Sequence, residues 1–217
     1  MLNLIWDLDG TLIDSAEEVM LALHMAIADA GLDESEMISP LRVGPTIDNI
    51  LKNSFPSAVL ADGKLDRAVK AFRQRYDNSS FEMTVAYPGL DRMLKNARCY
   101  TNYVITNKPD LPSGRIIEKL GWKLYIKKLI TPYTYNETEK QKKAELFREL
   151  VRTENLDPAR SYGIGDMEPD CRAAQAAGIN TIGVLWGTGT ASELGCCDFC
   201  CATVPELERL LESLCTK

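Results

Sequence analysis

The sequence predicts an α/β fold, in which a parallel sheet with flanking helices is interrupted near its start by an inserted α-helical domain. Short apolar runs typical of buried strands alternate with helical segments over residues 86–217, which indicates βαβ units. Residues 15–85 contain helical patterns only, although they follow the first strand directly. We therefore expect a core domain of residues 1–14 and 86–217, and an inserted helical domain of residues 15–85.

The first predicted strand, residues 2–8, runs into the polar segment Asp7-Leu8-Asp9-Gly10-Thr11. Side chains alternate along a strand, so Asp7 and Asp9 are expected on the same side. Two neighbouring carboxylates raise each other's pKa, and a hard divalent cation such as Mg²⁺ removes that conflict. Gly10 allows a sharp turn close to a ligand. The alternative interpretation is a buried strand that ends in an ordinary Asp-Gly turn.

The inserted domain is expected to contain at least three helices. Ser15 and Glu18 have the spacing of a capping box, which predicts a helix that continues to Gly31. Ser39-Pro40 predicts a further short helical turn. Another helix is expected to start at Thr46, and an apolar stripe from Leu65 to Tyr76 predicts the last one.

The rest of the chain alternates between the two kinds of element. Later strands are expected over residues 103–106, 124–130, 162–165, 179–185 and about 199–203. Helices are expected to end at Leu120, to cover 143–151 and 204–214, and to run from Pro169 to Gly178. In such a sheet, ligands bind outside the carboxyl ends of the strands.

Three predicted strands end in chemically useful side chains. The first ends at Asp7 and Asp9, another at Thr106-Asn107, and a third at Asp166, with Asp170 four residues later. A lysine that opens a helix, Lys142 or Lys143, could reach the same edge of the sheet. Carboxylates, hydroxyl donors and a lysine together suit phosphoryl transfer, because they can hold a metal ion and neutralise phosphate oxygens.

Composition limits the possible partners. The chain has 217 residues, of which 45% are hydrophobic and 26% charged, as in ordinary globular proteins. Its formal charge of −6 and the absence of a basic stripe argue against a nucleic-acid partner. No segment reaches the roughly 18 apolar residues that span a bilayer, and early aspartates interrupt any secretion signal. We expect a cytoplasmic monomer or homodimer with no membrane or nucleic-acid partner.

In the residues at these strand ends, the chain resembles the haloacid dehalogenase superfamily. The four ordered motifs of that superfamily are similar to Asp7-Leu8-Asp9-Gly10-Thr11-Leu12, Thr106-Asn107, the lysine near 143, and Gly165-Asp166-Met167-Glu168-Pro169-Asp170. The inserted helices resemble the C1 cap of the phosphoglycolate-phosphatase-like branch. Thr106-Asn107-Lys108-Pro109 and Val43-Gly44-Pro45-Thr46 also look like segments of that branch. The resemblance implies a Rossmann-like core with a helical cap.

The resemblance also implies roles for the four aspartates. Asp7 would be the nucleophile that forms an aspartyl-phosphate. Asp9 would act as general acid for the leaving group and then as general base for water. Mg²⁺ would be held by the carboxylates of Asp7 and Asp166 and by the backbone carbonyl of Asp9. Asp170 would orient metal-bound waters.

The phosphoryl group would be bound by Thr106, Asn107 and the motif lysine. This branch usually has Lys-Pro at that point, whereas this chain has Gln141-Lys142-Lys143-Ala144, so spacing alone does not choose between the two lysines. We favour Lys143, because the apolar helical periodicity starts there. Either lysine could instead be a solvated residue at the helix end.

The resemblance implies a Mg²⁺-dependent phosphatase whose partner is a small-molecule phosphate ester. Phosphoglycolate, sugar phosphates, nucleotides and pyrophosphate are all candidate substrates. A dehalogenase or a phosphomutase on the same fold, or a non-catalytic binding protein, are the alternatives. Asp9 argues against the dehalogenase, which needs no acid at that position. Val19 argues against the mutase, because it stands at about the position where mutase relatives carry a cap histidine.

The seven cysteines include two adjacent pairs, Cys196-Cys197 and Cys200-Cys201. Without a secretion signal they are expected to be reduced thiols. The pairs could hold a metal ion, since a Cys-x-x-Cys step occurs in zinc sites. No second Cys or His group of suitable spacing follows, so we expect them to pack in the core instead.

Overall fold

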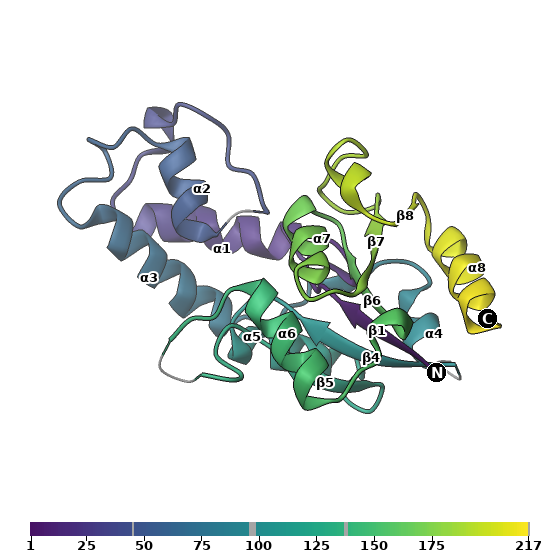
Figure 1. The fold of residues 1–217 in the computed structure, drawn as a ribbon. Coiled ribbons are helices and arrows are strands. Elements are labelled where there is room, and N and C mark those ends of the chain that lie inside the picture. The colour runs from purple at the N-terminus through teal and green to yellow at the C-terminus, as the bar shows by residue number, and fades with distance from the viewer. Residues whose placement is uncertain (45, 96–98, 137–138, 217) are drawn as a thin grey trace. The chain divides into compact units, whose positions relative to one another are not determined.

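A computed structural model describes residues 1–44, 46–95, 99–136 and 139–216, and it divides the chain into two compact units (Figure 1). One unit comprises Met1–Asp14 together with Val85–Lys217, and the other is Ser15–Thr84. In the part of the chain that is described, no helix has the length and apolar character needed to cross a bilayer.

The first unit is built on a parallel sheet whose strands lie in the order β5-β4-β1-β6-β7-β8. Its strands are β1 (Leu2–Trp6), β4 (Tyr100–Ile105), β5 (Ile126–Ile130), β6 (Ser161–Gly165), β7 (Asn180–Val184) and β8 (Phe199–Cys201). The parallel α/β fold that the sequence predicts is therefore confirmed. The first strand of the chain lies inside the sheet, between β4 and β6.

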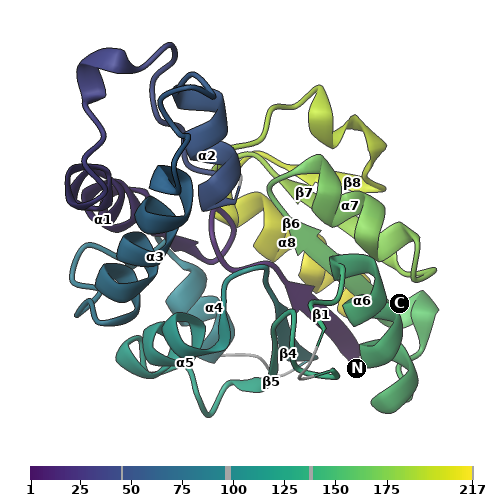
Figure 2. The ribbon, with the colours of Figure 1, turned by 90° about the vertical axis from the view of Figure 1, so that its left-hand side faces the viewer.

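Helices cover both faces of this sheet. They are α4 (Leu90–Lys95), α5 (Asp110–Lys119), α6 (Lys143–Thr153), α7 (Glu168–Gln175) and α8 (Val204–Cys215), with 3-10 turns η2 (Pro158–Arg160) and η3 (Glu193–Cys196). Helices α6 and α7 pack together against β4, β6 and β7, and Figure 2 shows α8 on the other side of the sheet. An ion pair of 3.0 Å between Arg92 and Glu208 joins α4 to α8.

The core beneath α6 and α7 explains why these segments form helices here. Leu146, Phe147 and Leu150 recur on one face of α6 and are buried against the sheet. Gly163 of β6 allows α7 to approach closely, because a Cβ at this position would lie 2.4 Å from the Cβ of Ala174.

Several short elements differ from the sequence-based expectation. Strand β1 ends at Trp6 rather than at residue 8, because the chain turns after Asp7. The carbonyl of Leu8 then accepts hydrogen bonds from the N–H groups of Leu12 and Ile13. A two-stranded antiparallel ribbon, β2 (Ile13–Asp14) with β3 (Val85–Ala86), and helix α4 were not expected. Asp9 therefore lies beyond the strand, and strand alternation does not determine the direction of its side chain.

The second unit is helical, with α1 (Ala16–Asp29), η1 (Glu34–Glu36), α2 (Ile47–Ser54) and α3 (Lys64–Asp77). Helices α1 and α2 both pack against α3. The buried stripe of α3 consists of Ala68, Phe72 and Tyr76, and the ring of Tyr76 also contacts Phe81. Arg75 of α3 forms a two-pronged ion pair with Asp29 of α1, at 2.6 and 2.8 Å.

Two expectations for this unit are wrong. Ser15 precedes α1 but makes no side-chain capping hydrogen bond. Glu18 is buried instead, where its carboxylate accepts hydrogen bonds from the Ser79 hydroxyl and from the N–H of Met83 at 2.9 Å. The helical turn expected at Ser39-Pro40 is absent, and the 3-10 turn lies earlier, at Glu34–Glu36. Pro45 of the segment Val43-Gly44-Pro45-Thr46 lies outside the described residues.

The cysteine prediction needs a partial correction. Cys201 is buried in the core, but Cys200 is exposed and Cys196 and Cys197 are half-buried. Strand β8 has solvent on one face, and alternation places Cys200 there. All seven cysteines are free thiols.

Candidate active site

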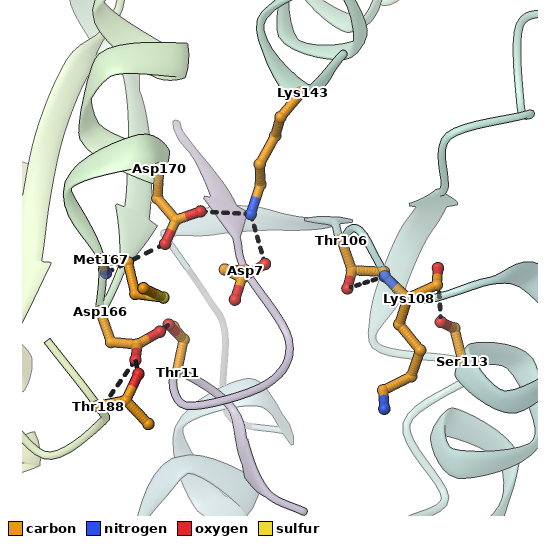
Figure 3. Close-up of polar contacts among 10 residues, drawn as sticks. All are labelled: Asp7, Thr11, Thr106, Lys108, Ser113, Lys143, Asp166, Met167, Asp170 and Thr188. Atoms are coloured by element: carbon orange, nitrogen blue, oxygen red, sulfur yellow. Dashed lines mark hydrogen bonds and ion pairs between the residues drawn. The ribbon is translucent and has the colours of Figure 1, made fainter. Parts of the chain in front are cut away.

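Three neighbouring strands bring the expected residues to one edge of the sheet (Figure 3). Asp7 follows β1, Thr106 follows β4 and Asp166 follows β6. The N–H of Asp7 still donates to the carbonyl of Ile164 at 2.8 Å, so the sheet pairing continues to this aspartate. The carboxyl ends of adjacent parallel strands meet, which is where ligands bind in this class of fold.

Lys143 connects two of the aspartates. Its ammonium lies 2.5 Å from Asp7 Oδ1 and 2.6 Å from Asp170 Oδ1, and the lysine side chain is only 7% exposed. Lys142 precedes α6 and is exposed. The structure therefore brings Lys143 into the cluster and leaves Lys142 outside it.

The carboxylates of Asp7, Asp166 and Asp170 form a cluster, with one oxygen of each within 4.8 Å of the others. Burial raises the pKa of Asp7 to about 8 against the opposing effect of Lys143, and the negative charges of Asp170 and Asp166 add to the rise. Burial also raises the pKa of Asp166. A hard dication would relieve this repulsion, so the donor set fits Mg²⁺.

Asp166 is held on both of its oxygens. Thr11 donates its hydroxyl proton to Oδ1 at 3.0 Å, while Oδ2 accepts from the N–H and the hydroxyl of Thr188 at 2.8 and 2.9 Å. A Cβ on Gly187 would lie 2.3 Å from the Gly10 carbonyl oxygen and 2.4 Å from Asp166 Oδ2. This aspartate is therefore fixed before any ligand arrives.

The segment that contains Gly187 and Thr188 was missed at the sequence level. It follows β7, the neighbour of β6, and so belongs to the same edge of the sheet. The run of small residues Gly187-Thr188-Gly189-Thr190, which begins two residues after the predicted strand 179–185, could have indicated this segment.

Asp9 lies on the turn after β1 and has a basic partner. Lys108 Nζ is 3.0 Å from Asp9 Oδ1, and the Lys108 side chain is 7% exposed. The sequence places Lys108 in the segment after β4 but does not by itself predict it as a site residue. A lysine two residues beyond a strand end was the signal for it.

Thr106 and Asn107 differ in their surroundings. Thr106 is buried, and its hydroxyl oxygen accepts a hydrogen bond from the N–H of Lys108 at 3.0 Å. In Figure 3, Thr106 and Lys108 lie on one side of Asp7, and Asp166 and Asp170 lie on the other. Asn107 is exposed beside Thr106. Phosphoryl binding by these two residues stays a prediction.

The comparison with protein families agrees with this geometry. The model of the haloacid dehalogenase-like hydrolase family matches residues 4–184, which include all of the residues described above except those beyond β7. The chain belongs to the haloacid dehalogenase-like hydrolases. Membership of that family makes the protein a hydrolase.

Individual relatives of this haloacid dehalogenase-like hydrolase are distant but similar in length. A 5'-nucleotidase from Pseudomonas aeruginosa is 26% identical over 97% of this chain and 96% of its own. A phosphoglycolate phosphatase from Aquifex aeolicus is 29% identical over 85% of this chain and 84% of its own. The structure of a haloacid dehalogenase-like family hydrolase from Streptococcus pneumoniae covers 98% of both chains with a TM-score of 0.79 and 20% identity, a similarity of fold.

Proposed function

We propose that this haloacid dehalogenase-like hydrolase is a Mg²⁺-dependent phosphatase that cleaves small phosphate monoesters through an aspartyl-phosphate on Asp7. The observation that carries the proposal is the cluster of Asp7, Asp166 and Asp170 with Lys143 in contact with two of them. The likeness to a 5'-nucleotidase and to phosphoglycolate phosphatases supports the same class of reaction.

The first chemical step would use two carboxylates of the turn after β1. Asp7 attacks the phosphorus atom, so that a bond forms between its carboxylate oxygen and phosphorus while the bond to the leaving oxygen breaks. Asp9 donates a proton to that oxygen, which leaves as an alcohol. In the second step Asp9 takes a proton from water, the water oxygen attacks phosphorus, and Asp7 is released with inorganic phosphate.

The other residues of the site would stabilise charge. Lys143 can place its ammonium against a phosphoryl oxygen, because it already lies 2.5 Å from the nucleophile. Thr106 and Asn107 would donate hydrogen bonds to the same group. Mg²⁺ would be held by the carboxylates of Asp7 and Asp166 and the backbone carbonyl of Asp9, with Asp170 orienting its waters. The cation supplies neutralisation of the phosphate charge.

The proposal also covers the role of the helical unit, the substrate, the oligomeric state and the compartment. The helical unit Ser15–Thr84 would act as the cap that selects the substrate. Phosphoglycolate and nucleoside monophosphates are the first candidates because of the named relatives, and sugar phosphates and pyrophosphate follow. We propose a cytoplasmic monomer or homodimer. The seven free thiols are consistent with a reducing compartment.

The test is phosphate release from a panel of these esters and pyrophosphate, measured with Mg²⁺ and again with EDTA. We expect release from one or a few monoesters that EDTA abolishes and added Mg²⁺ restores. The Asp7→Asn variant serves as the control for a contaminating phosphatase. Absence of release from every ester by folded protein, or release that EDTA leaves unchanged, would contradict the proposal.

A further inference from the structure

Three cysteines outside the active site converge on one point in the first unit. They are Cys171 of α7, Cys196 at the end of η3, and Cys197, which follows it. Their sulfur atoms all lie within 4.8 Å of one another. Cys171 is 3% exposed, and the other two are half-buried. The chain thus folds a residue from one helix against two residues that come more than twenty positions later.

The backbone around these thiols is fixed by other contacts. Gln175 of α7 donates from Nε2 to the carbonyl of Cys196 at 2.7 Å, which joins the two segments directly. Asp198, the residue after the cysteine pair, accepts from the N–H and the hydroxyl of Thr181, both at 2.8 Å. The Cys197 sulfur lies over Gly183 of β7, where a Cβ would approach it to 3.1 Å. The thiols are therefore held together by groups other than themselves.

We propose that Cys171, Cys196 and Cys197 form a binding site for a thiophilic d¹⁰ metal ion, Zn²⁺ or Cu⁺. Three sulfur atoms at about 2.3 Å from one ion lie roughly 3.8–4.0 Å apart, so the cluster needs only a small adjustment to close around it. Thiolate ligands favour such soft ions over Mg²⁺. Each thiol that becomes a ligand loses its proton to solvent. The exposed guanidinium of Arg172, which forms an ion pair of 3.1 Å with Glu168, also interacts electrostatically with Cys196 and Cys171.

A disulfide between the two adjacent cysteines does not explain the arrangement. Adjacent residues such as Cys196 and Cys197 have Cα atoms about 3.8 Å apart across a trans peptide, which is shorter than ordinary disulfides require. The described residues contain no cis peptide bond.

The site would stabilise the active centre without taking part in the reaction. Cys171 directly follows Asp170, which bonds to Lys143. Cys196 and Cys197 follow the segment whose Thr188 bonds to Asp166. A metal ion bound to the three sulfurs would link α7 to η3. It would therefore restrain the helix that contains Asp170 and the segment that contacts Asp166.

The test uses the full chain, reduced and then freed of reductant, with excess Mg²⁺ present so that the carboxylate cluster is occupied. Zn²⁺ and, anaerobically, Cu⁺ are titrated separately against a chromophoric chelator, and Cd²⁺ is titrated for its thiolate charge-transfer absorption. Cys196→Ser removes one half-buried ligand, and Cys200→Ser is the matched control, since Cys200 is exposed and outside the cluster. Circular dichroism establishes that each variant is folded.

We expect one equivalent of Zn²⁺ or Cu⁺ to bind, with protection of three thiols from alkylation and a rise in Tm of about 5 °C or more. Affinity should fall by more than about tenfold in Cys196→Ser and stay unchanged in Cys200→Ser. Equal affinity in the two variants would place the ion elsewhere and overturn the proposal. So would the absence of binding to reduced protein, or a purified protein whose mass and thiol count show a Cys171 disulfide.

Discussion

At the residue scale, Lys143 is a buried cation between two carboxylates of the candidate active site. Burial alone would lower its pKa, but the carboxylates of Asp170 and Asp7 outweigh burial and the pKa is raised. The ammonium is therefore charged at neutral pH. It lies between the carboxylates of Asp7 and Asp170, and in the proposed reaction it would contact a phosphoryl oxygen.

This position predicts different outcomes for two adjacent lysines. Lys143→Met should lower kcat by about 10²–10³-fold, because a preorganised positive charge is removed from the reacting group. Lys142→Met is the matched control and should stay within about twofold, since its side chain is exposed. Steady-state phosphate release from both folded variants is the measurement. Equal losses in the two variants would show that any positive charge at the start of α6 suffices, and would contradict a specific role for Lys143.

The two aspartates of the first motif predict different kinetic behaviour. Asp7→Asn should reduce turnover by more than about 10³-fold, because the amide is not a nucleophile. Asp9→Asn should accumulate a phosphorylated enzyme, because the water that hydrolyses it has no base. Rapid quenching with mass spectrometry would detect an added phosphoryl group on Asp7. Near-normal turnover by Asp7→Asn with Mg²⁺ would rule out the covalent scheme.

At the element scale, the segment after β7 acts as a support for Asp166. Gly187→Ala introduces a Cβ that would collide with the Gly10 carbonyl and with Asp166. We expect a loss of about 1–3 kcal/mol in the free energy of unfolding and a lower affinity for Mg²⁺. Gly114→Ala in α5 is the matched control, because its Cβ meets nothing within 4 Å. Thermal unfolding and Mg²⁺ titration of both variants would test this, and equal Tm values would contradict it.

The sequence predicted the long elements well and the short ones poorly. The longer helices and the sheet strands have apolar periodicities that a single chain displays, and Asp7, Thr106 and Asp166 follow from the strand ends alone. Ser15 and Glu18 have the spacing of a capping box, yet Glu18 is used by Ser79 and Met83, which are distant in sequence. The α4 helix and the β2–β3 ribbon are too short to show a period.

Other parts of the site could not be read from local patterns. Lys142 and Lys143 differ by about 100° around their helix axis, and only the packed helix shows which one faces Asp7. Cys171 is separated from Cys196 by a strand and a turn, so their proximity depends on the fold. The alternative interpretation of the sequence, a metal site, combined Cys196 and Cys197 with Cys200 and Cys201, whereas the structure brings Cys171 to the first pair.

At the scale of the whole molecule, the buried acidic cluster predicts a metal-dependent pH profile of stability. Without metal, the pKa of Asp7 is about 8 in the folded protein, compared with about 3.9 in an unfolded chain. The folded state therefore binds more protons between these values, so stability should decrease as pH rises from 5 to 8. Mg²⁺ takes the place of the proton and should abolish the decrease.

The measurement is Tm against pH for EDTA-treated protein, with and without added Mg²⁺. Asp7→Asn is the control, because an amide does not titrate and its metal-free profile should be flatter than that of the parent. A metal-free Tm that rises or stays constant between pH 5 and 8 would contradict the assignment of the pKa shift to Asp7.

The position of β1 inside the sheet also has a consequence for biosynthesis. Asn3 pairs with Thr101 on one side and with Ser161 on the other, so the strand that leads into Asp7 is synthesised before both of its partner strands. Such non-local pairing has a high contact order and is slow to form. The helical unit Ser15–Thr84 is local in sequence and can fold on the ribosome while β1 still has two unsatisfied edges. We therefore expect the nascent chain to be most prone to aggregation before residue 161 has left the ribosome.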